Sequence, residues 1–181
     1  MTAIFPAVLD ACVLIPMPLA DTLLRLAAGP RVYLPKWTDR IMAEVSRNLQ
    51  ESFGLSQNQA TYRETEIRRH FPEAWVEGYE DLIPSMTNSK KDRHVLAAAV
   101  HSKAEVIVTY NGKDFPQATL LPYSITVQGP STFLTNLYHL NPEAMIHTLQ
   151  EQATAINKPF KYVIDRLRFN APRFVDILRF G

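Results

Sequence analysis

Several acidic side chains of this chain lie at positions where a folded sheet would place its functional site. The short apolar run at residues 4–9 ends abruptly in Asp10, as a buried parallel strand does when it leaves a sheet. Functional sites in open parallel sheets collect beyond the carboxyl ends of the strands. A lone carboxylate there loses solvation unless a cation or hydrogen-bond donors compensate. Asp10 is therefore a candidate metal ligand, and the alternative is an Asp that caps the next helix.

Asp92 is the second candidate, because of the helix that it opens. Apolar residues follow it at the third, fourth, seventh and eighth positions, which places its carboxylate on their face of the helix. An acid in the first turn also interacts favourably with the helix dipole, but that benefit would be the same for an acid facing outwards. The facing of Asp92 therefore favours a site over a simple dipole effect.

Glu44 and a later loop add further oxygen ligands. Glu44 lies near the edge of an apolar stripe on the helix predicted at residues 38–50, where the alternative is a side chain that extends to solvent. The loop at residues 110–115 follows a β-branched run and contains Asn111 and Asp114. Its alternative interpretation is an Asn-Gly turn with a polar Asp.

Strands that alternate with helices must position these acids. We predict strands at residues 4–9, 31–34, 105–109 and 123–127, the second stopped by Pro35, with helices at 19–28, 38–50 and 91–102 and another opening at 130. This alternation predicts an α/β fold, a doubly wound α/β/α sandwich around a mainly parallel central sheet.

Two segments lie outside this alternation. Residues 52–82 are polar with scattered aromatics, and we predict a helical insert of two helices broken near Pro72. Beyond Asn141 the pattern is helical only, so we expect residues 1–140 to form the main domain and residues 141–181 a C-terminal helical extension. Exposed Phe169, Phe174 and residues 177–178 would let that extension pack on the edge of the sheet, lengthen a dimer interface or receive a partner segment.

The composition of the chain limits which class of protein it can be. The chain has 181 residues, 46% of them hydrophobic, enough for one buried α/β core. Its single cysteine, Cys12, cannot form an internal disulfide, and no signal peptide or membrane-length apolar run is present, so we expect a cytoplasmic protein with no membrane role. Net charge is only +1, but residues 158–181 carry six basic and two acidic side chains, a basic tail that could meet phosphates or simply be a solvated helical surface.

The order of these acids resembles that of the PIN-domain ribonucleases, and in particular of the VapC-type toxins of bacterial toxin–antitoxin systems. The matching pieces are Val8-Leu9-Asp10, Glu44-Val45 followed by Leu49, the run from Asp92 to Ala99, the run from Val108 to Phe115, and the later turn from Gly129 to Leu134. Asn111 stands where some relatives have a fourth Asp, and Asp114 could restore that carboxylate. The resemblance covers residues 4 to 138 and implies a PIN-like fold.

An oxygen-only set of this kind favours Mg²⁺ or Mn²⁺ over zinc. We expect Asp10 and Asp92 to bind the metal directly, and Glu44 and Asp114 to bind it directly or through water. Thr109 and Asn111 would make water-mediated or indirect contacts, and Lys90, Lys91 and Arg93 would contact RNA phosphates or be merely solvated. For the two histidines of the helix at 91–102, His94 and His101, we expect surface or packing roles, and Cys12 fits a small buried side chain better than a catalytic thiol.

The resemblance implies hydrolysis of RNA, leaving a 5′-phosphate and a 3′-hydroxyl, with tRNA or rRNA as substrate. It also implies a cognate antitoxin protein, and we expect a homodimer. The rival interpretation is a non-catalytic PIN-like module that binds RNA or a protein, with acids too few or too far apart to hold a metal.

Overall fold

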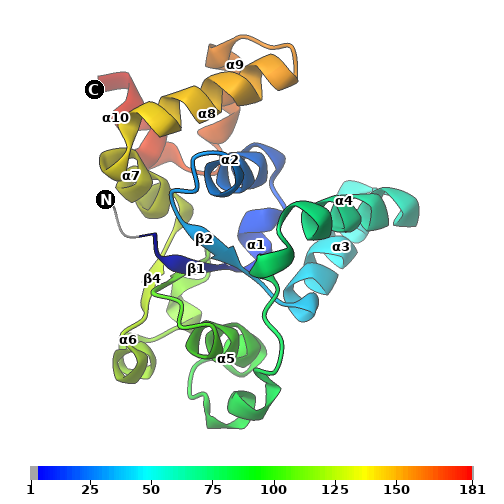
Figure 1. The fold of residues 1–181 in the computed structure, drawn as a ribbon, viewed down its shortest axis with the longest axis vertical. Coiled ribbons are helices and arrows are strands. Elements are labelled where there is room, and N and C mark those ends of the chain that lie inside the picture. Colours follow the sequence, from blue (N-terminus) through cyan, green and yellow to red (C-terminus); the bar gives the residue numbers. More distant parts are fainter. Residues whose placement is uncertain (1–3, 181) are drawn as a thin grey trace.

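A four-stranded parallel sheet forms the centre of the molecule (Figure 1). The computed structural model describes residues 4–180, and the side chains of residues 4–178. The strand order is β2-β1-β3-β4, and each neighbouring pair is parallel. The strands are β1 (Pro6–Leu9), β2 (Leu34–Lys36), β3 (Val106–Val108) and β4 (Thr126–Gln128). The predicted PIN-like α/β fold is confirmed.

Helices connect the strands and continue beyond them. The α-helices are α1 (Ala11–Leu14), α2 (Met17–Ala28), α3 (Asp39–Phe53), α4 (Gln57–His70), α5 (Arg93–His101), α6 (Gln117–Leu120), α7 (Pro130–Leu140), α8 (Pro142–Ala155), α9 (Phe160–Leu167) and α10 (Pro172–Phe180). Short 3₁₀ turns are η1 (Pro72–Ala74), η2 (Glu80–Ser85), η3 (Lys90–Asp92), η4 (Gly112–Asp114) and η5 (Leu121–Tyr123).

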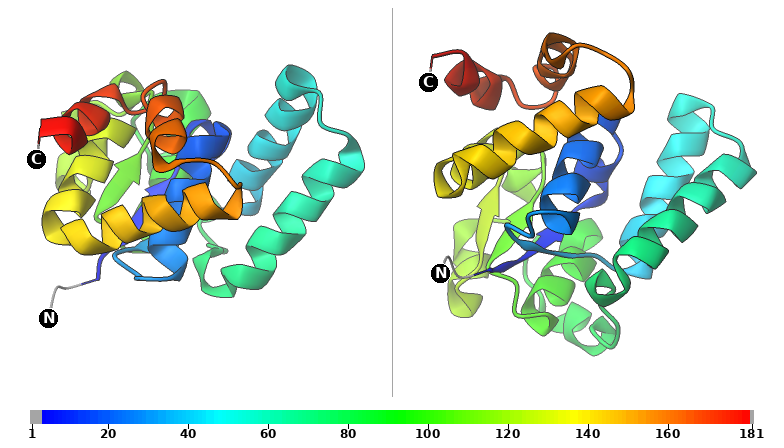
Figure 2. Two further views of the ribbon diagram at one scale, coloured as in Figure 1. Left: turned by 90° about the horizontal axis from the view of Figure 1, so that it is seen from above. Right: turned by 45° about the horizontal axis from the view of Figure 1, so that its top comes forward.

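The sheet lies between two helical layers (Figures 1 and 2). Helix α5 packs on β1 and β3 from one side, while α2 packs beside β2 on the other. Helices α3 and α4 pack against each other and stand beside the sheet as a pair. All four strands point the same way, so the acids at their carboxyl ends reach one edge of the sheet.

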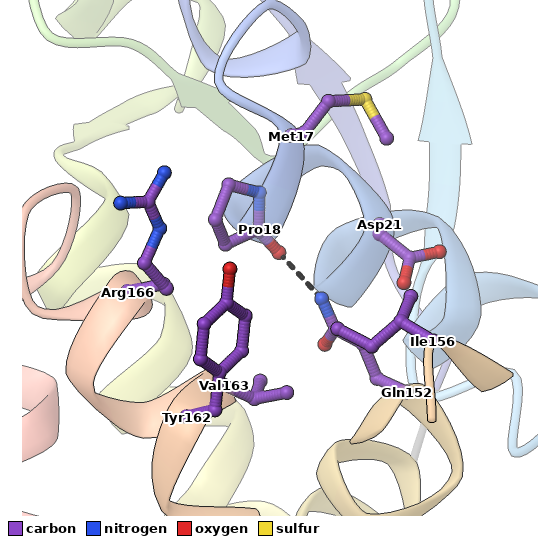
Figure 3. A pocket seen from close by; sticks show the side chains of 8 residues that line it. All are labelled: Met17, Pro18, Asp21, Gln152, Ile156, Tyr162, Val163 and Arg166. Atoms are coloured by element: carbon purple, nitrogen blue, oxygen red, sulfur yellow. Dashed lines mark hydrogen bonds between the residues drawn. The ribbon is translucent and has the colours of Figure 1, made fainter. Parts of the chain in front are cut away.

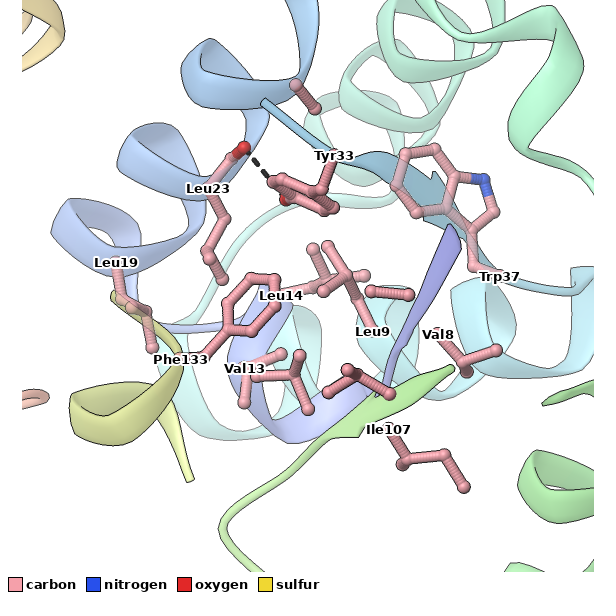
Figure 4. Packing of buried hydrophobic residues seen from close by; sticks show 14 of the residues in the cluster. Val8, Leu9, Val13, Leu14, Leu19, Leu23, Tyr33, Trp37, Ile107 and Phe133 are labelled. Carbon is pink, nitrogen blue, oxygen red and sulfur yellow. Dashed lines mark hydrogen bonds between the residues drawn. The ribbon is translucent and has the colours of Figure 1, made fainter. Parts of the chain in front are cut away.

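Aromatic and aliphatic side chains fill the space between the sheet and α2 (Figure 4). Tyr33 is fully buried, and its hydroxyl donates to the carbonyl of Leu23 over 2.9 Å. Its ring meets Phe133 of α7 edge to face, with 5.1 Å between ring centres. Because the Tyr33 hydroxyl has a hydrogen-bond partner, burying it costs little free energy of solvation. The buried ring fixes β2 and α7 against α2.

The second strand was predicted three residues too early. We expected Pro35 to stop it, yet Pro35 lies inside β2 and pairs in register with Ala7. The reason is position in the sheet: β2 is an edge strand, and proline is tolerated there because its missing N–H is not needed by a further strand.

Helix α3 is longer than the predicted 38–50, and the insert is less helical than predicted. Thr38 caps α3 by accepting from the Ile41 amide over 3.1 Å, and Gly54 ends it in the left-handed region at φ 69°. Only one of the two helices predicted at 52–82 forms, as α4. After Pro72 the chain instead makes the short turns η1 and η2, held by a bridge between Trp37 and Trp75.

The C-terminal helices pack onto the rest of the chain instead of standing apart. Helix α8 lies along α2, where the Gln152 amide donates to the Pro18 carbonyl over 3.0 Å (Figure 3). Phe174, expected to be exposed, is fully buried, whereas Phe169 is 81% exposed. Residues 177 and 178 are half-buried. The domain boundary at 140/141 stays a prediction.

Candidate active site

Asp10 is held firmly at the carboxyl end of β1. It is 4% exposed, and its Oδ1 accepts from the Ala11 amide over 2.8 Å while its Oδ2 accepts from the Thr109 hydroxyl over 2.7 Å. The predicted cap is therefore present, because Asp10 caps α1, and its second oxygen also contacts the end of β3. Its role as a metal ligand stays a prediction. The two bonds fix the carboxylate's direction while leaving acceptor positions on each oxygen free.

Asp92 sits at the start of α5 with its carboxylate turned inwards, as the sequence indicated. It is 9% exposed, makes no capping hydrogen bond, and its Oδ2 is buried without a hydrogen-bond partner. Burial raises the pKa of Asp92, the ammonium of Lys91 opposes this, and the negative charges of Asp10 and Asp114 raise it further. The negative charges of Asp10 and Asp114 therefore act on the pKa of Asp92.

Asp114 faces the same cluster from the turn η4 after β3. The Lys91 ammonium lies 2.9 Å from Asp114 Oδ2 and 3.7 Å from Asp92 Oδ2. Asp114 Oδ2 is buried and has an ion-pair contact without hydrogen-bond geometry. Asp114 first, and then Asp92, raise the pKa of Lys91. A cation thus already neutralises these acids in part.

Glu44 of α3 contacts His94 of α5, which stands two residues after Asp92. The distance from His94 Nε2 to Glu44 Oε1 is 3.3 Å, and the hydrogen bond from His94 is the main cause that lowers the pKa of Glu44, against the opposing effect of burial. His94 is 1% exposed and its Nδ1 is buried without a partner. We predicted a surface or packing role and missed this contact. The available signal was a histidine two residues after Asp92, directly before the apolar run from Val95 to Val100.

Thr109 links the ends of the two central strands. Besides donating to Asp10, its hydroxyl accepts from the Asn111 amide over 3.0 Å. Cys12 Sγ lies 3.4 Å from the same hydroxyl, and burial first, then the charge of Asp10, raises the pKa of the thiol to about 12. The thiol therefore stays protonated and is a poor nucleophile.

The basic residues predicted to contact RNA lie around Asp92. Lys90 is exposed, Lys91 faces the acids, and Arg93 is half-buried with its Nε donating to the Asn88 carbonyl over 3.3 Å. Lys90 therefore has the free side chain of the three, while the other two hold the turn η3 and its neighbours in place.

The donor set suits a hard divalent cation. In the part of the chain that the structure describes, no three His, Cys, Asp or Glu side chains already stand close enough together to hold a metal ion. The buried oxygens of Asp92 and Asp114 accept no hydrogen bond, and one exposed ammonium, that of Lys91, is the positive group beside both of them among the described residues. Carboxylate and water oxygens are what Mg²⁺ and Mn²⁺ prefer, so these residues fit such an ion by their chemistry.

The doubly wound sheet with acids from the ends of β1 and β3 and the start of α5 defines a PIN-like protein with an acidic site. The chain is 44% identical over 104 residues to a protein of Mycobacterium tuberculosis (strain ATCC 25618 / H37Rv) named "Putative ribonuclease VapC50". The match covers 56% of this chain and 62% of that protein, less than two thirds of its length. The chain is thus VapC-like over the matched residues.

The other comparisons found no match. Neither a protein-family model nor a solved structure matches this chain. Within residues 4–180, no helix is long and apolar enough to cross a membrane.

Proposed function

We propose that this protein is a metal-dependent endoribonuclease that hydrolyses RNA phosphodiester bonds, and that it acts as the toxin of a type II toxin–antitoxin pair. The observation that carries the proposal is the placement of Asp92 and Asp114 beside the Lys91 ammonium, each with a buried oxygen that lacks a hydrogen-bond partner, while Asp10 is buried at the carboxyl end of β1. Similarity to a relative named as a ribonuclease supports it.

Asp10 and Asp92 would hold Mg²⁺ or Mn²⁺ directly, with Glu44 and Asp114 binding it directly or through water. The bound ion would polarise the scissile phosphate and lower the pKa of a water ligand. Thr109 keeps the Asp10 carboxylate in one orientation through its 2.7 Å bond. Asn111, whose amide is tied to Thr109, stands beside the site for indirect contacts.

The substrate would be structured RNA such as tRNA or rRNA, cut to leave a 5′-phosphate and a 3′-hydroxyl. Lys90 is exposed two residues before Asp92 and would contact phosphates, with Lys91 and Arg93 next to it in the chain. We also propose a homodimer, a cognate antitoxin protein as partner and a cytoplasmic location.

One observation favours the rival function of a non-catalytic module that binds RNA or a protein. Basic side chains already lie against three of the four acids: His94 against Glu44, and Lys91 against Asp114 and, at 3.7 Å, Asp92. If those contacts persisted in solution, the acids would hold a metal only weakly. Metal dependence of RNA cleavage separates the two functions.

The decisive experiment is cleavage of total bacterial RNA by the purified protein with Mg²⁺ or Mn²⁺. An Asp10→Asn/Asp92→Asn double variant, with folding checked by circular dichroism, is the matched control. We expect discrete fragments that disappear on chelation and in the variant. Equal cleavage by both proteins would contradict the acidic site, and no cleavage with any metal would favour the binding module.

A further inference from the structure

A half-buried arginine without an acidic partner lies close to the acidic site. Arg63 of α4 donates from Nη2 to the carbonyl of Leu14 over 2.6 Å, but its Nη1 is buried without a hydrogen-bond partner. Among the residues that the structure describes, no carboxylate forms an ion pair with Arg63, although burial lowers its pKa. A guanidinium stays charged under such conditions, so this cation lacks an anion.

Arg63 lines a groove where a second guanidinium also stands. The groove has a volume of about 440 Å³ and runs between the start of α2, the α3–α4 pair and the turn from α9 to α10. Arg166 of α9 lines it too, and its side chain rises towards the start of α2 (Figure 3). The lining otherwise consists of apolar residues and Asn170, so the groove is positively charged and contains no acid to neutralise it.

Three elements join this groove to the acidic site. Helix α1 begins at Asp10 and ends at Leu14, whose carbonyl holds Arg63. Helix α3 carries Glu44 and, five residues later, Leu49 of the groove wall. The loop after β3 reaches the groove as well, because the Tyr110 hydroxyl donates to the Asn170 carbonyl over 2.9 Å. A polymer cut at the acids would have this groove beside it.

Exposed aromatic rings complete the groove. Phe169 is 81% exposed and Phe53 is 61% exposed, and both line it. The Arg166 guanidinium lies 6.0 Å from the centre of the Phe169 ring, so a flat surface and a positive charge stand together there. Unpaired nucleotides bind to surfaces where aromatic rings lie beside cations, because the bases stack on the rings and the phosphates contact the positive charges.

We propose that this groove binds the single-stranded RNA segment that flanks the cleavage site, with Arg63 and Arg166 contacting phosphates and Phe169 stacking on a base. The inference rests on the proposed ribonuclease function and adds where the substrate lies. An acidic protein segment could also satisfy the arginines, but the elements that the groove shares with the acids and the aromatic rings beside the cations favour RNA.

The test uses the full chain carrying Asp10→Asn, so that RNA is bound without being cut. Binding of a fluorescein-labelled single-stranded RNA is measured by anisotropy over a range of salt concentrations. We compare Phe169→Ala and Arg166→Gln with two controls on α4 outside the groove, Tyr62→Ala and Arg69→Gln, whose side chains are 68% exposed in both cases.

Phe169→Ala is expected to raise the Kd at least about fivefold, the lower end for loss of one stacked base. Arg166→Gln should reduce the slope of log K against log salt by about 0.7, the value for one phosphate contact on a single strand. Both control variants should bind like the parent. Arg63→Gln should behave like Arg166→Gln, and its melting temperature shows whether loss of the Leu14 bond has disturbed the fold.

Unchanged RNA binding by Phe169→Ala and Arg166→Gln, with a parent that binds RNA, would overturn the groove proposal and assign the groove to another partner, such as a protein. The proposed ribonuclease function would still stand if the native chain cleaved RNA. If the parent bound no RNA and the native chain cut none with Mg²⁺ or Mn²⁺, the proposed function would fail, and the groove proposal with it.

Discussion

The acidic site and the groove beside it carry side chains of opposite charge. In the acidic site, buried carboxylates gather at strand ends, and Asp10 is fixed by two hydrogen bonds. In the groove, the half-buried Arg63 and the exposed Arg166 stand on helices, and the exposed ring of Phe169 stands on the turn between α9 and α10. A negative, enclosed site suits a metal ion, whereas a positive, open surface suits a flexible polyanion. Under the proposed function, catalysis and substrate binding would be divided between these two neighbouring regions.

Removing the metal would separate the two regions most sharply. With EDTA, we expect cleavage to fall by more than about 100-fold, because the ion supplies the activated water. Binding of a single-stranded RNA should change by less than about twofold, since the groove contains no acids. Cleavage is followed on gels and binding by anisotropy. Equal losses of both would mean that RNA is held by the metal and not by the groove.

Loss of the histidine behind Glu44 is expected to have the next largest effect. His94→Leu removes the hydrogen bond to Glu44, and cleavage should fall about tenfold, as happens when partners of metal ligands are removed. The fall should be in kcat, with KM nearly unchanged. His94→Gln keeps a side-chain donor and should recover part of the rate. If the two variants were equally active, His94 would be a packing residue only.

Removing the charge of Lys91 is expected to have a smaller effect, and to strengthen metal binding instead of weakening activity. Its ammonium lies against Asp114 and must be displaced or shared when a metal ion binds. Lys91→Gln should therefore bind Mn²⁺ about two- to fivefold more tightly, the modest range of an exposed ion pair. Calorimetric titration measures this, with the exposed neighbour Lys90→Gln as control. Weaker Mn²⁺ binding by Lys91→Gln would show instead that the lysine helps to shape the site.

The smallest effect is expected where the two regions touch. Tyr110→Phe removes the hydrogen bond to the Asn170 carbonyl, which ties the loop after β3 to the turn between α9 and α10. The free energy of unfolding should fall by about 0.5 to 1 kcal/mol, measured by urea denaturation. The affinity of the variant for RNA should also fall slightly, by more than the loss of folding stability alone would cause. An unchanged affinity would indicate that the groove keeps its shape without this bond.

The fold and two of the acids could be predicted because their signals are local. Alternating strands and helices follow from short-range periodicity, and the inward facing of Asp92 follows from the apolar residues three and four positions after it. Asp10 follows directly from the end of an apolar run. The position of β2 could not be predicted in this way, because whether Pro35 can join a strand depends on that strand being at the edge.

The sequence by itself determined the PIN-like alternation of elements, the places of Asp10 and Asp92, and the oxygen chemistry that suits Mg²⁺ or Mn²⁺. Only the tertiary structure decided which side chains neutralise one another. The contact of His94 with Glu44 joins α3 to α5, and the contact of Lys91 with Asp114 joins two turns on either side of β3. The groove of Arg63 and Arg166 joins residues about a hundred positions apart. Such pairs depend on the packing of distant elements, which no local pattern of residues encodes.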